Sequence, residues 1–220
     1  MYYKKNRLKT NSEIRKVIMG QYFISDLHFQ HNLVSSLRGF ETPEAHDTAL
    51  IAAINKRVTP KDELFILGDV TFNANRKGWQ ENLSLVDKLN GTKHLIVGNH
   101  DRCAPNNTRA YAYKSEFEKH FASVSEFIRL SYEGKPVYLS HYAYDESDPA
   151  FNHKDDNLSY EQFRLRDTGH LILHGHTHTK EIITFSKEGT PQVNVNVESI
   201  GMSPITLAEI ASKLTYKWKS

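Results

Sequence analysis

Five short apolar runs recur along the chain, and most of them end in small or polar residues. They are Gln21–Ser25, Leu64–Leu67, His94–Val97, Pro136–Ser140 and Leu171–His174. Because these runs are continuous rather than alternating, they are typical of strands buried on both faces of a sheet. A sixth run, Gln192–Val197, alternates valine with asparagine and predicts a strand with only one buried face.

Helical patterns lie between these runs. Thr42 and Pro43 supply an N-cap and a proline at the first helical position, and apolar residues then recur on one face. Ser203 and Pro204 repeat this start signal ahead of a second helix. Strands that alternate with helices predict an α/β fold. No linker rich in Gly, Pro or Ser divides the 220 residues, so we expect a single domain over residues 19–220.

The composition excludes several classes of protein. With 39% hydrophobic and 25% charged residues, the chain has the balance of an ordinary globular protein. Cys103 is the only cysteine and has no partner for an internal disulfide, which favours a reducing, cytoplasmic location. We assign its thiol no catalytic role. No stretch approaches about 18 consecutive apolar residues, so we expect no membrane partner.

The first 18 residues are unusually basic, with six Lys and Arg residues against the single acidic residue Glu13. A signal peptide is not indicated, because Gly20 and Gln21 interrupt the apolar run that follows. A nucleic-acid-binding arm is an alternative, since such clusters bind phosphates. We interpret residues 1–18 as a solvated basic extension. The whole chain carries +2, so the remainder is slightly acidic, and we expect no extended nucleic-acid binding.

Side chains that bind metals follow all five continuous runs. In open α/β sheets, ligands gather beyond the carboxyl ends of the strands. The runs are followed in order by Asp26 and His28, by Asp69, by Asn99, His100 and Asp101, by His141, and by His176 and His178. Imidazole, carboxylate and amide oxygen together favour divalent Mn, Fe, Zn, Co or Ni. Seven candidate ligands are too many for one tetrahedral ion and suit two divalent transition-metal ions.

Such a pair of ions suits phosphoester hydrolysis. The ions hold a water between them, lower its pKa and neutralise the oxygens of a phosphoryl group. The leaving alkoxide then needs an acid. His100 lies among the third set of polar residues, and histidine can donate or accept a proton at neutral pH, so His100 is the candidate for this role.

The five motifs resemble those of a known superfamily. Asp26-x-His28, Gly68-Asp69, Gly98-Asn99-His100-Asp101, His141 and Gly175-His176-x-His178 are similar, in this order, to the motifs of calcineurin-like metallophosphoesterases. The resemblance runs from Tyr22 to about Pro204. The phrase Ser25–Asn32 is similar to a small phosphodiesterase branch found in bacteria and phages.

This resemblance implies a four-layer α/β/β/α sandwich of two mixed β-sheets flanked by helices. It implies one ion held by Asp26, His28, Asp69 and His178, and a second held by Asp69, Asn99, His141 and His176. The nucleophile would be a hydroxide that bridges the ions. His100 would contact the substrate and leaving group as general acid, and Asp101 would orient it.

The resemblance favours a phosphodiesterase that acts on a nucleotide or another small phosphodiester. A phosphomonoesterase and a non-catalytic metal-binding scaffold are the alternatives. The scaffold is disfavoured because none of the motif residues is missing. A nuclease guided by the basic extension is a further alternative.

Substrate contacts are less defined. His31 is a candidate phosphate contact or the start of a helix, and Arg102 is a candidate contact for an anionic substrate or a solvated cation. His174 is interpreted as a supporting histidine. The segment 142–173 mixes aromatic and charged residues, which suits either a nucleobase platform or a surface lid. Thr71–Trp79 is a second candidate rim.

Overall fold

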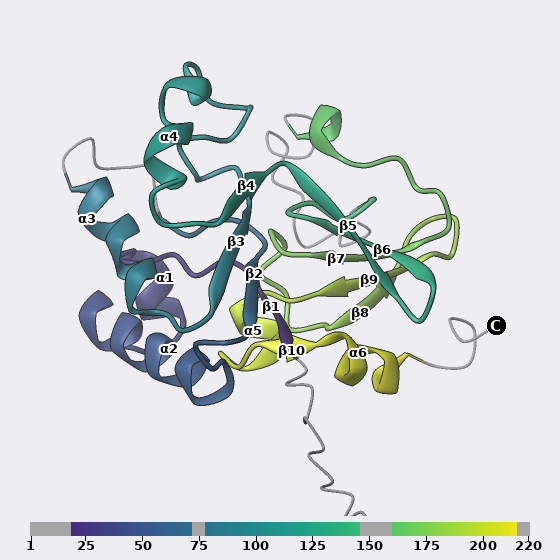
Figure 1. Ribbon diagram of the computed structural model, residues 1–220, viewed down its shortest axis with the longest axis horizontal. Helices are drawn as coiled ribbons and strands as arrows, with labels where there is room; N and C mark the ends of the chain where they lie inside the picture. The colour runs from purple at the N-terminus through teal and green to yellow at the C-terminus, as the bar shows by residue number, and fades with distance from the viewer. Residues whose placement is uncertain (1–18, 72–77, 146–159, 215–220) are drawn as a thin grey trace, which may run out of the picture.

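The computed structural model describes residues 19–71, 78–145 and 160–214. The expected basic extension, residues 1–18, lies outside this part of the chain. Two five-stranded sheets pack face to face, with strand orders β10-β1-β2-β3-β4 and β5-β6-β7-β9-β8 (Figure 1). No helix in the three described ranges is long and apolar enough to cross a lipid bilayer.

The first sheet is mixed. Its four parallel strands are β1 (Gln21–Ile24), β2 (Glu63–Ile66), β3 (Thr92–Ile96) and β4 (Ser123–Ser125), and β10 (Ile205–Thr206) pairs antiparallel with β1. The parallel pairing explains why three continuous apolar runs coincide with β1, β2 and β3, because parallel strands are covered on both faces.

The second sheet is also mixed. It contains β5 (Phe127–Tyr132), β6 (Lys135–Ser140), β7 (Leu171–His174), β8 (Ile183–Phe185) and β9 (Pro191–Asn194). The strands β6, β7 and β9 are parallel to one another, whereas β5 and β8 run antiparallel at the two edges.

Helices flank the sheets. They are α1 (Asn32–Leu37), α2 (Pro43–Arg57), α3 (Trp79–Ser84), α4 (Lys114–Phe117), α5 (Val197–Ile200) and α6 (Leu207–Lys213), with short 3₁₀ turns at Leu85–Lys88, Ala110–Ala112 and Glu161–Phe163. One buried cluster joins Ile24 and Ile66 to Leu50 and Ile54 of α2. A second joins Phe23 of the first sheet to Leu173 of the second. Two mixed sheets with flanking helices confirm the predicted fold.

The two predicted helix starts have different outcomes. Thr42 caps α2, where its Oγ1 accepts a hydrogen bond from the Ala45 amide at 3.1 Å, and Pro43 is the first helical residue. The prediction at Ser203 and Pro204 is wrong. The chain forms β10 first, and α6 begins only at Leu207. Thr206 and Glu209 form a capping box there, which satisfies the first free amides of the helix better than Ser203 would.

The run Gln192–Val197 also departs from its prediction. The strand β9 ends at Asn194, and Val197 already belongs to α5. Asn194 and Asn196 are buried rather than solvated, with 1% and 0% exposure. Their side chains bond inside the protein: Asn194 donates to Thr177 Oγ1 at 3.0 Å, and Asn196 accepts from the Ser199 amide at 2.8 Å. Hydrogen-bonded amides can be buried, so the alternation did not mark a solvent face.

Candidate metal centre

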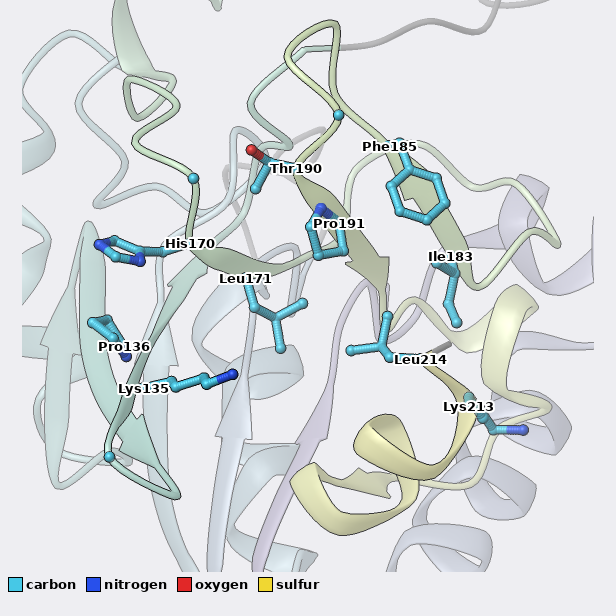
Figure 2. Close-up of a pocket in the computed structure, with 13 residues that line it drawn as sticks. Lys135, Pro136, His170, Leu171, Ile183, Phe185, Thr190, Pro191, Lys213 and Leu214 are labelled. Carbon is cyan, nitrogen blue, oxygen red and sulfur yellow. The ribbon is translucent and has the colours of Figure 1, made fainter. Parts of the chain in front are cut away.

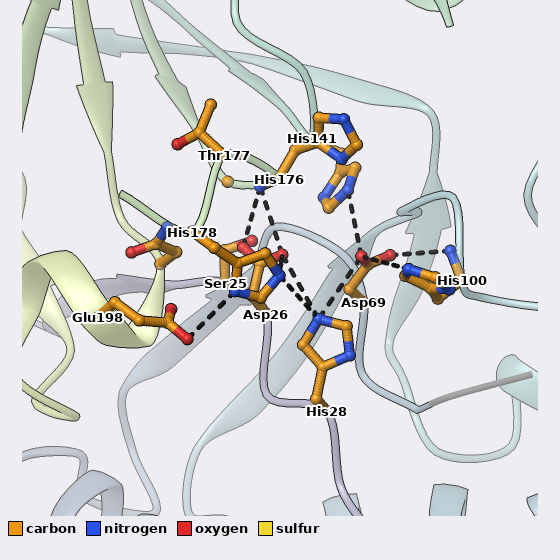
Figure 3. Close-up of polar contacts among 12 residues, drawn as sticks. Ser25, Asp26, His28, Asp69, His100, His141, His176, Thr177, His178 and Glu198 are labelled. Atoms are coloured by element: carbon orange, nitrogen blue, oxygen red, sulfur yellow. Dashed lines mark hydrogen bonds and ion pairs between the residues drawn. The ribbon is translucent and has the colours of Figure 1, made fainter. Parts of the chain in front are cut away.

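The predicted ligands come together where β1, β2, β3, β6 and β7 end (Figure 3). Side chains from both sheets therefore meet at one edge of the sandwich. Most of them are inaccessible: Asp26, His28, Asp69 and His141 are each at most 1% exposed, and Asn99 is 8% exposed.

The loops that carry these ligands have an uncommon backbone conformation. Residues other than glycine rarely adopt positive φ, and such strained positions cluster at functional sites, each at a cost of about 1–3 kcal/mol. Five candidate ligands do so, with φ of 61° at Asp26, 49° at His28, 54° at Asp69, 70° at His176 and 50° at His178. The surrounding structure holds these residues in conformations that turn their side chains into the site.

Two motif glycines permit the loops to approach one another. A Cβ atom at Gly98 would collide with the backbone nitrogen and side chain of Asp69. A Cβ atom at Gly175 would collide with Ser25 Oγ and Asp26 Oδ2. The glycines before Asn99 and His176 are therefore required by close packing of one ligand loop on the next.

One cluster of donor atoms is the Asp26 group, which consists of Asp26, His28 and His178. Its donor atoms lie within 4.8 Å of one another. The Nε2 atoms of His28 and His178 face each other at 3.2 Å, and they lie 3.8 Å and 3.6 Å from Asp26 Oδ1. His28 Nε2 is also 3.7 Å from Asp69 Oδ2.

The second cluster is the Asp69 group, which consists of Asp69, His141 and His176, with donor atoms again within 4.8 Å of one another. His141 Nε2 lies 3.5 Å from Asp69 Oδ2 and 2.9 Å from Asn99 Oδ1. Asp69 Oδ2 is therefore close to a histidine of each group. The structure brings all seven candidate ligands together and places Asp69 between the two groups.

The electrostatics of the site fit divalent cations. Asp26 and Asp69 are buried carboxylates, and within the described residues their ion-pair partners are all histidines rather than Lys or Arg. Burial raises the pKa of Asp26 and lowers the pKa of His28 and His176 well below the usual value. Buried carboxylates are costly without a compensating charge. Neutral imidazoles beside carboxylates are the donors that divalent transition metals prefer.

The sequence analysis missed Glu198 and Arg38. Glu198 Oε1 accepts a hydrogen bond from His178 Nδ1 at 3.1 Å, and Arg38 contacts the same oxygen at 2.7 Å. Burial alone would lower the pKa of His178, but the Glu198 bond and the Asp26 carboxylate outweigh it and raise that pKa to about 9. Burial alone would raise the pKa of Glu198, but His178 and Arg38 lower it to about 2. Glu198 follows β9, so the strand-end argument would have found it.

His100 lies at the solvent side of the ligands. Its side chain is 36% exposed, and its Nε2 is 3.9 Å from Asp69 Oδ2. The His100 amide donates to Asp69 Oδ1 at 2.9 Å, and its ring centre is 5.5 Å from that of His28. His100 therefore lies next to both groups while remaining accessible to a substrate.

Asp101, the residue expected to orient the His100 ring, contacts the backbone of the ligand loops. The buried Asp101 carboxylate accepts hydrogen bonds from three backbone amides, those of Asp69, Val70 and Gly98, at 2.9–3.0 Å. These amides belong to two ligand loops that need an acceptor inside the protein. Asp101 thus holds the loops around Asp69 and Asn99 together through these three amides.

The remaining predicted residues fall into different surroundings. His31 caps α1, with Nδ1 accepting from the Val34 amide at 3.4 Å, and its ring centre lies 5.5 Å from that of His28. The helix-start interpretation holds, and the ring also borders the site. The Arg102 guanidinium lies over the rings of Trp79 and Tyr113, so it packs on aromatic side chains. His174 is fully buried and contacts the Gly175 carbonyl through Nδ1 at 3.0 Å.

Two aromatic residues of the segment 142–173 lie beside the Asp69 group. Tyr142 stacks on Tyr160 with a centroid distance of 5.4 Å, and both rings meet the His176 ring edge-on. Phe151 lies outside the described residues, as does Phe72 of the second candidate rim. Trp79 of that rim is 4% exposed and packs on Phe117, so it is a core residue.

A cavity of about 830 Å³ lies elsewhere, at the opposite end of β7 (Figure 2). Leu171, the first residue of β7, lines it together with Pro136 and Leu214. The described residues that line it include neither group of candidate ligands.

Comparisons with known proteins agree with this architecture. A family model described as a calcineurin-like phosphoesterase superfamily domain matches residues 19–203. The gene 66 protein of Mycobacterium phage L5 is 34% identical over 74% of this chain and 79% of its own length, and that of phage D29 is 31% identical over 81% and 87%. The crystal structure of a protein of unknown function from Aquifex aeolicus superposes with a TM-score of 0.61 at 27% identity, covering 89% of this chain and 100% of that one.

Proposed function

The chain belongs to the calcineurin-like phosphoesterase superfamily, and we propose that it hydrolyses phosphodiesters at a centre of two divalent ions. One observation carries this proposal. Two groups of buried donor atoms lie side by side, and a carboxylate oxygen of Asp69 is 3.7 Å from His28 of one and 3.5 Å from His141 of the other. Shared carboxylates of this kind are typical of two-metal hydrolases.

We assign the ligands by proximity. Asp26, His28, Asp69 and His178 would hold one ion, and Asp69, Asn99, His141 and His176 would hold the other. When bound, the ions supply positive charge to the phosphoryl oxygens and make a water more acidic. Manganese is the first ion to test, because the donor set combines carboxylate, amide and imidazole.

His100 would act on the leaving group. Its partly exposed imidazole lies beside the shared carboxylate, at the side from which a substrate would reach the two groups. His100 Nε2 lies 3.9 Å from Asp69 Oδ2. As general acid, the His100 imidazole would give a ring proton to the alkoxide leaving group as the bond to phosphorus breaks.

Diesters are favoured over monoesters because Ser25–Asn32 is similar to a phosphodiesterase branch. The stacked Tyr142 and Tyr160 beside His176 favour a substrate with a nucleobase, such as a nucleotide. A monoesterase or a metal-binding scaffold is the alternative. The single cysteine supports a cytoplasmic setting, and we place the activity in residues 19–220, so removal of residues 1–18 should leave it unchanged.

The proposal is tested by loading the protein with Mn²⁺ and verifying the bound metal. Turnover is then compared on bis(p-nitrophenyl) phosphate, on p-nitrophenyl phosphate and on 2′,3′-cyclic nucleotides. We expect faster turnover of diesters. Faster turnover of the monoester would show that the protein is a phosphomonoesterase. If the metal-loaded protein turns over none of these substrates, the non-catalytic scaffold is the remaining hypothesis.

The role of His100 has its own test. The His100→Ala variant should keep both ions, because no assigned ligand is removed. Its turnover should fall most on diesters with poor leaving groups and least on nitrophenyl esters, which need little protonation. Equal losses on both substrates would remove the acid role.

A further inference from the structure

We propose that Glu198 is a positioning residue, which fixes the imidazole of His178 toward the ion in the Asp26 group and is itself held by Arg38. This inference rests on the proposed function only in assuming that the Asp26 group holds an ion. It concerns two residues that lie outside the five motifs, and it predicts that the two metal positions differ in what supports them.

The first observation is the contact between Glu198 and His178. Glu198 Oε1 lies 3.1 Å from His178 Nδ1, which leaves His178 Nε2 as the atom that faces Asp26 and His28 (Figure 3). A carboxylate on the outer ring nitrogen keeps a hydrogen there, so Nε2 presents its lone pair to the ion. The same bond fixes the plane of the ring.

The second observation is how Glu198 is held. Arg38 contacts Glu198 Oε1 through Nη2 at 2.7 Å and through Nε at 2.8 Å, and the Arg38 side chain is only 6% exposed. Glu198 Oε2 is buried and has no hydrogen-bond partner among the residues that the structure describes. The orientation of the Glu198 carboxylate is therefore set by the hydrogen bonds of one oxygen, Oε1, with Arg38 and His178.

Arg38 also holds the loop that carries Asp26 and His28. Its Nη2 donates to the Asp26 carbonyl oxygen at 2.7 Å, and its Nη1 donates to the Leu27 carbonyl oxygen at 3.1 Å. Asp26 and His28 have positive φ, so this loop needs support. One guanidinium thus ties the β1 loop to Glu198 and, through it, to His178 beyond β7. The planar fork of arginine is required for these contacts, and lysine has only one charged nitrogen.

Two buried residues of α2, His46 and Asp47, help to fix the position of Arg38. His46 Nε2 lies 3.0 Å from Arg38 Nη1, and His46 Nδ1 lies 2.8 Å from Asp47 Oδ1. Asp47 Oδ2 in turn accepts from the Gln30 amide at 3.1 Å. The contacts form a continuous chain from α2 to the Asp26 group, which gives Arg38 a fixed position from which to orient Glu198.

The Asp69 group has a different support. His141 Nδ1 contacts the Leu67 carbonyl oxygen at 2.7 Å, whereas the contacts of Glu198 and Arg38 described above go to His178, to the β1 loop and to His46. Loss of Glu198 should therefore weaken one metal position and leave the other intact. A general loss of structure would weaken both.

The test is Mn²⁺ titration by calorimetry on wild-type protein and on Glu198→Gln and Glu198→Ala. We expect wild type to bind two ions. In the variants one ion should bind about 10–100-fold more weakly, as is typical when the partner of a ligating histidine is removed, and the second should bind as before. Electron paramagnetic resonance of Mn²⁺ should change from the signal of a coupled pair to that of a single ion.

A matched control is Glu209→Gln, which removes the carboxylate from another arginine pair, since Arg57 Nη2 lies 2.7 Å from Glu209 Oε1. That variant should bind both ions normally. Glu198→Asp keeps the charge and should recover part of the affinity that Glu198→Ala loses, and Arg38→Lys should weaken the same single position. Melting in chelator separates folding from metal binding.

Folded Glu198→Ala that binds two ions as wild type does would overturn the inference. So would equal weakening of both ions in Glu198→Gln. Wild-type protein that binds no Mn²⁺, or only one ion, would instead overturn the proposed two-metal centre.

Discussion

The Asp26 group and the Asp69 group contain the same ligand types, one aspartate and two histidines, but the protein supports them differently. In the Asp26 group, the outer nitrogen of His178 contacts the Glu198 carboxylate, which Arg38 holds. In the Asp69 group, the outer nitrogen of His141 contacts a neutral carbonyl, that of Leu67. Similar ligand sets can therefore be oriented either by charged side chains or by backbone.

Exposure explains the difference. The His178 side chain is 30% exposed, whereas that of His141 is fully buried. Packing fixes the ring of His141 from all sides, and one carbonyl is enough to set its tautomer. His178 has fewer neighbours to confine it, so its orientation depends on a strong charge-assisted hydrogen bond. The four predictions below separate the two groups, from the largest expected effect to the smallest.

Asp69→Asn removes the carboxylate that lies between the two groups, so it should weaken metal binding at both of them. Metal ions contribute several kcal/mol to stabilising a phosphoryl transition state, so we expect turnover to fall by about 10³-fold or more. Both Mn²⁺ ions should bind more weakly in calorimetry. Retention of one ion at wild-type affinity would show that Asp69 belongs to only one position.

Gly175→Ala should damage the Asp26 group first, because the new Cβ would collide with Ser25 Oγ and Asp26 Oδ2. We expect a loss of about 1–3 kcal/mol in the free energy of unfolding, measured by urea denaturation, together with weaker binding of one ion. Gly134→Ala is the control: its φ is +79° but nothing lies near its Cβ position, so it reports backbone strain without a collision. Equal effects of the two variants would contradict the packing argument.

Asp101→Asn should affect the Asp69 group more than the Asp26 group. The carboxylate accepts from the amides of Asp69, Val70 and Gly98, and an asparagine NH₂ cannot accept a hydrogen bond. We expect a loss of about 1–3 kcal/mol in the free energy of unfolding in chelator, and weaker binding of the ion nearer to Asn99. If the variant instead loses only the activity on poor leaving groups, Asp101 acts through His100 after all.

The pH dependence of metal binding should also distinguish the Asp26 group from the Asp69 group. The pKa of His178 is raised to about 9, so this ring carries a proton at pH 7 that an ion must displace. Below that pKa, affinity for one ion should rise by up to about tenfold per pH unit as pH increases. Calorimetry between pH 6.5 and 8 in buffers of different ionisation enthalpy would measure the released proton. In Glu198→Gln the slope should decrease, and an affinity independent of pH in wild type would contradict the assignment.

Much of the fold and site follows from local patterns. Continuous apolar runs predicted β1, β2, β3, β6 and β7, and the polar residues after them gave the seven candidate ligands that the structure brings together. Edge strands such as β5 and β8 were not predicted. Only one face of an edge strand need be apolar, and β5 alternates exposed and half-buried positions over six residues.

Some contacts and element boundaries could not be predicted from local patterns. Asp101 lies in a metal motif, but its carboxylate bonds backbone amides that a sequence does not locate in space. Arg102 follows it and looks available to an anion, yet its guanidinium packs on Trp79 and Tyr113 from other parts of the chain. Pro204 resembles a helix start, but the capping box at Thr206 and Glu209 sets the actual one.

The sequence by itself determined which residues can bind metal and in what order they follow the strands, because strand periodicity and ligand chemistry are local properties. Only the tertiary structure decided which residues hold those ligands in place. Arg38 and Glu198 are 160 positions apart, and nothing in either neighbourhood encodes their contact. They meet because the end of β1 lies beside the start of α5, where Ser25 forms a parallel bridge with Asn196. Burial there makes a hydrogen-bonded ion pair stronger than it would be in water.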